Sequence, residues 1–209
     1  MVNSRLDKLR HKIIERELDA ILVSQPMNYR YITGFTGASG SLLVSQDSAI
    51  LAVDSIHFEQ AKMEAPGFNI LHIKNRIEGF GVLIGDQGIH DLGFEANNLT
   101  YSEARRWEEQ ADSMQVRLIP TEGLVESLRL LKDDEEISDL KKAAELADKA
   151  IEHITDWLAP GVSEKEAAWE AEKFLRENGS ETLPFEAIVA SGPNAALPHA
   201  RPTRRSIEE

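Results

Sequence analysis

Apolar residues recur at alternating steps of three and four between positions 137 and 158, which predicts one long helix with a single apolar stripe. The stripe consists of Ile137, Leu140, Ala144, Ala147, Ile151, Ile154 and Leu158. An acidic run at residues 133–136 lies in the first turn, where each charge gains about 0.3–1 kcal/mol from the helix dipole. A coiled-coil seam would show a similar stripe, but about three heptads is short for one. We therefore expect this helix to pack against a sheet.

Upstream of this helix, short runs of strand-forming residues alternate with helical segments. Strands are predicted at residues 20–23, 41–44, 49–53, 69–73, 89–94 and 115–119. Helices are expected to begin at Ser4, to span residues 56–65, and to begin at Thr100, which forms a capping-box pattern with Glu103. Residues 28–37 contain two glycines and are expected to form a loop. The alternation predicts an α/β domain over residues 1–130, followed by a second domain over residues 131–209.

A second helix is expected in the carboxyl-terminal part. Ser163 and Glu166 match another capping box, and Asn178-Gly179 provides a helix stop. The following segment contains the run Pro198-His199-Ala200-Arg201-Pro202, which has too much proline for a helix. His199 is therefore expected to lie on a loop.

Composition excludes several classes of function. A formal net charge of −13 over 209 residues argues against a nucleic-acid partner, because phosphate binding requires clustered Lys and Arg. The absence of cysteine excludes disulfides, thiolate nucleophiles and Cys-ligated zinc. The polar amino terminus lacks the apolar stretch of a signal peptide, and no window is long and apolar enough to span a membrane. We therefore expect no membrane partner and a cytoplasmic location.

Four segments, in order along the chain, resemble the creatinase/aminopeptidase P family of pita-bread metallopeptidases. They are residues 28–40, residues 93–101, residues 124–137 and residues 185–202, the last of which includes Ala190-Ser191-Gly192-Pro193-Asn194 and Pro198-His199. Within that family the sequence is most similar to Xaa-Pro aminopeptidases and Xaa-Pro dipeptidases. The resemblance implies a creatinase-type mixed α/β domain followed by an incomplete α+β pita-bread domain.

The resemblance also implies a chemistry. A complete family member hydrolyses the bond before proline with two divalent metal ions, typically manganese, held by two aspartates, one histidine and two glutamates. A pair of such ions generates hydroxide near neutral pH and stabilises the oxyanion. None of these five ligands has a counterpart here, and the sequence stops at Glu209 before the first expected aspartate. We therefore expect no metal site in this chain alone.

Two residues are candidate site residues by resemblance. His199 matches a non-ligand histidine beside the substrate, where it contacts the substrate and takes part in proton transfer. Phe185 is expected near the substrate pocket, although a core phenylalanine is an equal alternative. The other histidines lack metal-ligand spacing, and Arg201, Arg204 and Arg205 are expected to be solvated charges.

These observations predict the amino-terminal portion of an Xaa-Pro aminopeptidase or dipeptidase that is truncated and inactive by itself. The resemblance further implies a homodimer. One alternative is a non-catalytic module that dimerises or binds proline peptides without cleaving them. Another is a fragment of a creatinase-like amidinohydrolase. Because the stripe at residues 137–158 would lack strands to cover it, residues after about Leu131 are expected to be loosely ordered.

Overall fold

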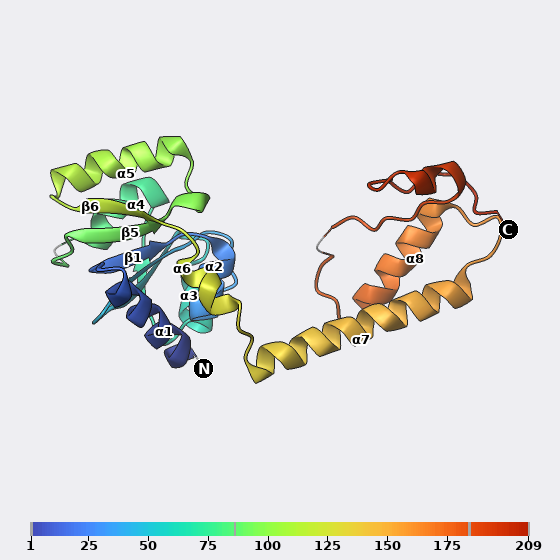
Figure 1. Cartoon of the computed structure of the whole chain (residues 1–209), viewed down its shortest axis with the longest axis horizontal. Coiled ribbons are helices and arrows are strands. Elements are labelled where there is room, and N and C mark those ends of the chain that lie inside the picture. Colours follow the sequence, from blue (N-terminus) through green and yellow to red (C-terminus); the bar gives the residue numbers. More distant parts are fainter. Residues whose placement is uncertain (1, 86, 184, 209) are drawn as a thin grey trace. The chain divides into compact units, whose positions relative to one another are not determined.

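The computed structural model describes residues 2–85, 87–183 and 185–208 and divides the chain into two compact units, Met1–Leu131 and Lys132–Glu209 (Figure 1). The first unit contains a six-stranded sheet with the strand order β4-β3-β2-β1-β5-β6. The strands are β1 (Ala20–Val23), β2 (Ser41–Ser45), β3 (Ala49–Val53), β4 (Asn69–His72), β5 (Asp91–Glu95) and β6 (Arg117–Thr121). Strand β2 pairs antiparallel with both β1 and β3, whereas the other neighbouring pairs are parallel. This sheet confirms the mixed α/β class.

Helices cover both faces of this sheet (Figure 1). Helices α1 (Val2–Glu15), α2 (Pro26–Thr33), α3 (Phe58–Glu64) and α6 (Leu124–Arg129) lie on one face. Helices α4 (Arg76–Ile84) and α5 (Tyr101–Ser113) lie on the other, and the short 3-10 helix η1 (Ala96–Asn98) follows β5. The predicted capping box of Thr100 and Glu103 at the start of α5 is confirmed. Both faces of the sheet are therefore buried, as is usual where parallel strands alternate with helices.

Each face of the sheet has its own apolar core. Tyr29 and Phe35 are buried on the face of α1, with their ring centroids 5.9 Å apart. On the opposite face, Trp107 of α5 stacks on Phe80 of α4 with a centroid distance of 5.0 Å. Aromatic pairs of this kind stabilise a fold by more than the burial of their apolar area alone. These two apolar cores hold the helices of the first unit against its sheet.

The prediction of a loop at residues 28–37 is wrong for its first half, because residues 28–33 belong to α2. Pro26 occupies the first turn, where its missing N–H costs nothing, and the Gln25 side chain accepts from the Asn28 N–H. The helix ends at Gly34, whose φ of +83° is a left-handed conformation that favours glycine. The proline was the overlooked signal of a helix start.

Other helix boundaries also differ from expectation. Helix α1 already includes Val2, so Ser4 lies inside the helix and does not cap it. Helix α4 was not predicted, because Gly79 and Gly81 lower the helix propensity of its sequence. A Cβ on Gly79 would lie 2.8 Å from Ile73 side-chain atoms, so close packing explains this glycine. Tertiary packing therefore overrides local propensity in this helix.

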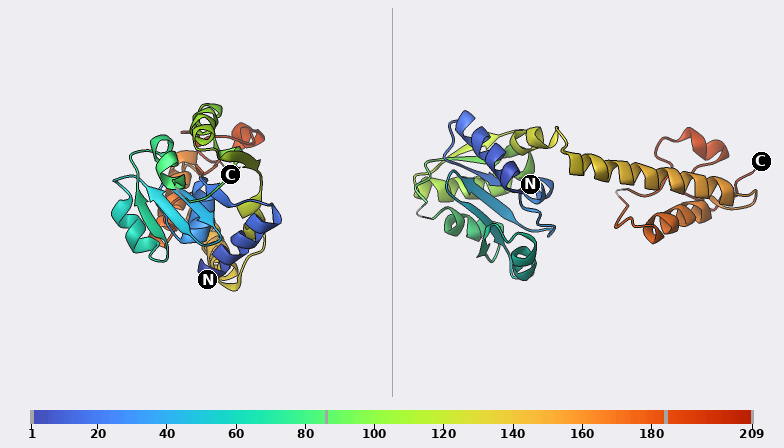
Figure 2. Two further views of the ribbon diagram at one scale, coloured as in Figure 1. Left: turned by 90° about the vertical axis from the view of Figure 1, so that its left-hand side faces the viewer. Right: turned by 90° about the horizontal axis from the view of Figure 1, so that it is seen from below.

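The second unit consists of two helices and irregular segments. Helix α7 (Asp134–Trp157) is one uninterrupted helix (Figure 2), and α8 (Glu164–Glu177) pairs with it. The Asp133 side chain accepts from the Glu136 N–H in a capping box that the sequence interpretation treated only as favourable charge. The 3-10 helix η2 (Gly192–Ala196) lies in the segment after α8. The His153 ring stacks on Phe174 at 4.5 Å and links the two long helices.

The prediction that the α7 stripe packs against a sheet is wrong in this structure. Ile137 is 41% exposed, Leu140 is 58% exposed and Ile151 is 69% exposed. Among the described residues of this unit, the β pairing consists of one isolated bridge between Ser163 and Ser206. The apolar spacing specifies which face of α7 is apolar, but it does not supply the surface that would cover that face. Across the described ranges, no helix has the length and apolarity needed to cross a bilayer.

Candidate functional site

The structure brings Phe185 and His199 to the wall of one cavity of about 410 Å³ in the second unit. The remaining lining residues are Glu186, Ala187, Ile188, Ala200, Arg201 and Pro202. Both side chains are accessible, and Phe185 is 72% exposed, so the alternative of a core phenylalanine is wrong. An accessible aromatic ring and an accessible imidazole on one wall can contact an apolar ring and a polar group of the same small ligand.

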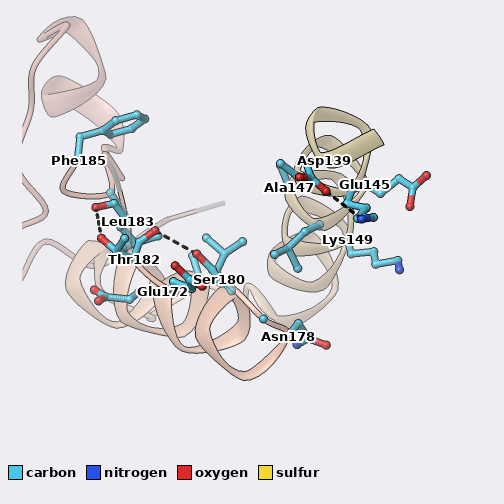
Figure 3. Close-up of a pocket in the computed structure, with 18 residues that line it drawn as sticks. Asp139, Glu145, Ala147, Lys149, Glu172, Asn178, Ser180, Thr182, Leu183 and Phe185 are labelled. Carbon is cyan, nitrogen blue, oxygen red and sulfur yellow. Dashed lines mark hydrogen bonds and ion pairs between the residues drawn. The ribbon is translucent and has the colours of Figure 1, made fainter. Parts of the chain in front are cut away.

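Phe185 also borders a larger cavity of about 1000 Å³ between α7 and α8 (Figure 3). Its apolar wall includes Leu146 of α7, Leu175 of α8 and Leu183. Charged side chains at its edge pair locally, as Lys142 does with Asp139 at 2.9 Å. This cavity is thus mainly a gap between two helices, whereas the smaller cavity combines the two predicted site residues.

The segment that carries His199 is attached to the start of α8 through one carboxylate. Glu164, at the first position of α8, is fully buried. Its Oε1 accepts from the Ser191 N–H at 2.7 Å and the Ser191 hydroxyl at 3.0 Å. Its Oε2 accepts from the Thr203 N–H at 3.0 Å and the Thr203 hydroxyl at 2.6 Å. The Asn194 Nδ2 lies 3.1 Å from both carboxylate oxygens.

Backbone pairing reinforces this attachment. The N–H of Glu164 donates to the Arg205 carbonyl at 3.0 Å, and the N–H of Lys165 donates to the Thr203 carbonyl at 3.1 Å. The first N–H groups of a helix have no partner within the helix. Here the carboxyl-terminal segment satisfies them, so residues 203–205 are held against the helix start by both main chain and side chain.

Gly192 has a left-handed backbone conformation, and the Arg205 side chain packs against it. Its φ is +50°, and a Cβ there would lie 2.7 Å from the Arg205 Nη2. Arg205 is only partly exposed, and its guanidinium lies 3.6 Å from the Glu208 carboxylate. Arg205 is therefore solvated only in part, because its side chain packs against this turn. Arg201 is exposed and lies 3.9 Å from Glu186.

Hydrogen bonding lowers the pKa of Glu164 to about 2 from an ordinary value of 4.5. The hydrogen bond from the Thr203 hydroxyl is the largest cause, and the N–H groups of Ser191 and Thr203 and the Asn194 amide add to it. Burial acts in the opposite direction but is outweighed. Multiple donors favour the ionised form of a carboxylate, because every one of these bonds requires an acceptor.

The attachment of the His199 segment is expected to survive mild acid. The pKa of Glu164 is lowered in the folded state, so its ionisation stabilises that state. This contribution to stability is complete above pH 4.5 and is lost as the pH falls towards 2. In an NMR titration of the chain, the amide resonances of Ser191 and Thr203 should shift with a midpoint near pH 2. A midpoint near 4.5 for these two amides would contradict the carboxylate network.

The sequence interpretation missed Glu164. It identified the capping box of Ser163 and Glu166, which is confirmed, since the Ser163 hydroxyl and the Glu166 carboxylate satisfy each other's backbone N–H groups. A glutamate in the first turn of a helix is common for electrostatic reasons, so Glu164 has no distinguishing local signal. Its partners lie 27 to 39 positions away, and local patterns do not reveal them.

A second buried carboxylate lies at the carboxyl end of β5 in the first unit. Glu95 accepts from the N–H groups of Ser24 at 2.6 Å and Gln25 at 2.7 Å, and from the Asn28 Nδ2 at 2.6 Å. Burial raises its pKa and outweighs these hydrogen bonds, which lower it. Asn28 opens the first of the four resemblance segments, and here it joins α2 to the sheet. This segment therefore has a structural role in the first unit.

The described residues do not fit a metal centre. Within residues 2–85, 87–183 and 185–208, no three His, Asp or Glu side chains converge as ligands. Two-metal hydrolysis requires such a set of oxygen and nitrogen donors.

Comparisons with known proteins agree with this architecture. Residues 5–131 match the creatinase/prolidase N-terminal domain, and residues 138–209 match metallopeptidase family M24. The chain is 38% identical to an uncharacterized peptidase of Bacillus subtilis over 98% of its length. It is 30% identical to an Xaa-Pro dipeptidase of Pyrococcus furiosus over 99% of its length. It spans 58% of each of these two relatives.

Among solved structures, an Xaa-Pro dipeptidase from Bacillus anthracis superimposes with a TM-score of 0.90 at 39% identity. The match covers 100% of this chain and 58% of that protein. The family resemblance carried by the four sequence segments is therefore confirmed. The chain belongs to the creatinase/prolidase family, with a creatinase/prolidase N-terminal domain at residues 5–131 and a metallopeptidase family M24 region at residues 138–209.

Proposed function

We propose that this chain is the amino-terminal portion of a metal-dependent peptidase that hydrolyses the bond before proline, with His199 and Phe185 as substrate-binding residues. The observation that carries the proposal is their shared cavity, within residues that match metallopeptidase family M24. Relatives named as Xaa-Pro dipeptidases support the substrate class. The whole protein's substrate is then an Xaa-Pro peptide.

The two side chains suit different parts of such a substrate. The exposed ring of Phe185 offers an apolar surface to a pyrrolidine ring, which has no polar group to satisfy. The His199 imidazole can donate a hydrogen bond through one ring nitrogen and accept one through the other. It therefore suits the scissile amide, or the tetrahedral intermediate that replaces it, where it can hold or transfer a proton.

Metal ions would supply the nucleophile in a complete enzyme. In a complete enzyme, two divalent ions, manganese by preference, would supply hydroxide near neutral pH and would stabilise the oxyanion. Oxygen and imidazole donors favour such ions over softer ones. The donor set must come from outside the described residues of this chain, whose role is to bind and orient the substrate. A homodimer and a cytoplasmic location are further parts of the proposal.

The proposal is tested with a hybrid protein, defined as residues 1–209 of this chain joined to the part of the Bacillus anthracis Xaa-Pro dipeptidase that lies beyond the matched region. The hybrid should cleave an Xaa-Pro dipeptide in the presence of Mn²⁺ and leave the matched Xaa-Ala dipeptide intact. Product formation is followed by chromatography, with the unmodified relative as the positive control.

Other outcomes identify the alternatives. Creatine hydrolysis by the folded hybrid, without dipeptide cleavage, would replace the proposal with a creatinase-like activity. A folded hybrid that binds Xaa-Pro peptides without cleaving them would favour the non-catalytic module. Inactivity towards all these substrates would contradict the peptidase proposal.

A further inference from the structure

We propose that Glu164 is a positioning residue for His199, acting by holding both ends of the segment from Ser191 to Thr203 on one buried carboxylate. This inference rests on the proposed function, in which His199 contacts the substrate. Glu164 itself lines neither cavity, so its effect must be transmitted through the segment it holds.

The first part of the argument is the placement of the two attachments. Ser191 and Asn194 precede His199, and Thr203 follows it, yet all three donate to the same carboxylate. Fixing both ends of a loop removes most of the conformational freedom of the residues between them. A single attachment would leave His199 on a free arm.

The second part is the short path between the attachments. The Leu197 N–H donates to the Asn194 carbonyl at 3.0 Å, and the Ala200 N–H donates to the Leu197 carbonyl at 3.2 Å. Two consecutive turns therefore connect Asn194 to His199. Ala200, the next residue, is buried. The backbone position of His199 is therefore set by the Glu164 carboxylate, through Asn194 and these two turns.

The third part is the chemistry of the carboxylate. Every group that faces Glu164 is a donor, either an N–H or a hydroxyl that can donate. A carboxylate has two oxygens that only accept, whereas a glutamine would place an NH₂ group against these donors. Glu164→Gln therefore keeps the volume but leaves donors without an acceptor around a buried side chain, which is costly inside a protein.

Glu166 provides a matched control in the same helical turn. Its carboxylate accepts from the Ser163 N–H at 2.9 Å and the Ser163 hydroxyl at 2.6 Å, and these bonds stay within the helix cap. Glu166→Gln removes the same charge from the same helix terminus. It therefore reproduces the effect on α8 itself without disturbing the attachments of the His199 segment.

The experiment uses the full 209-residue chain labelled with ¹⁵N. Heteronuclear NOE values report backbone motion on the picosecond-to-nanosecond timescale. For residues 192–202, Glu164→Gln should lower these values well below those of α8, whereas Glu166→Gln should leave them unchanged. Unchanged values in Glu164→Gln would overturn the proposal. If Glu164→Gln does not fold, Thr203→Val is used, since it removes the 2.6 Å hydrogen bond without changing charge, and the same two outcomes apply.

A kinetic cycle in the hybrid protein separates positioning of His199 from general support of the fold. Misplacing a catalytic group by about 1 Å can cost about 100-fold in rate, so Glu164→Gln should lower kcat by about that factor with a smaller change in KM. Adding Glu164→Gln to His199→Ala should cause little further loss, because the two residues act as one unit. Full additivity would overturn the positioning role.

These measurements distinguish the two proposals. Loss of segment order in Glu164→Gln, in an otherwise folded hybrid that never cleaves dipeptides, would contradict the proposed function while supporting the attachment of the segment. An active hybrid whose kcat is insensitive to Glu164→Gln would contradict the positioning role and leave the proposed function standing.

Discussion

Replacing His199 with alanine in the hybrid protein is expected to lower kcat for Xaa-Pro cleavage by about 100-fold, the lower range for removing a general acid or base. The expected change in KM is much smaller, because the imidazole interaction should strengthen as charge develops in the transition state. His199 is exposed on the cavity that it shares with Phe185, so its removal opens no void in a core.

The control for this variant is His90→Ala, which removes an exposed histidine of the first unit just before β5. Steady-state kinetics of the two variants are compared at the same Mn²⁺ concentration, with circular dichroism to verify folding. Only the His199 variant should be impaired. A kcat within twofold of the parent hybrid would exclude His199 from the chemistry.

The accuracy of the sequence predictions depended on how local their signals were. The strands at Ala20–Val23 and Ala49–Val53 were predicted with correct bounds, because compact apolar runs flanked by polar turns are a local pattern. The capping boxes at Thr100 and Ser163 are likewise contained within four consecutive residues, and both are present. Short strands and helix capping boxes can therefore be predicted from the sequence without any knowledge of the tertiary fold.

Features that depend on distant partners were missed or misjudged. The stripe on α7 correctly indicated a helix, but whether it is covered depends on other segments, and Leu140 and Ile151 are exposed here. Helix α4 contains glycines that local propensity disfavours, and Gly79 is explained only by its approach to Ile73. Such contacts are set by tertiary packing, which a single sequence does not display.

The candidate site shows the same division. His199 and Phe185 were identified through family resemblance, and the structure places both on one cavity. Glu164 was missed, because a first-turn glutamate looks the same whether it faces solvent or holds a loop. Its full burial and its bonds to Ser191 and Thr203 become evident only in three dimensions.

The second large effect concerns the chain by itself. We expect the 209 residues alone to have no Mn²⁺-dependent Xaa-Pro peptidase activity, a loss of at least about 10⁶-fold, the lower range of enzymatic acceleration, relative to the active hybrid. Hydrolysis of this type requires paired cations held by several carboxylates and an imidazole. Within the described ranges, the acidic and histidine side chains form no such cluster, although Phe185 and His199, the proposed substrate-binding residues, line one cavity.

The central claim is that this chain binds the substrate but does not hold the metal ions. The most direct test is a titration of the isolated chain with Mn²⁺ by calorimetry, combined with an assay of an Xaa-Pro dipeptide under the same conditions. The chain should bind no stoichiometric Mn²⁺ and release no proline, while the hybrid assayed in parallel does both. Two Mn²⁺ ions bound per isolated chain, together with proline release, would contradict the account.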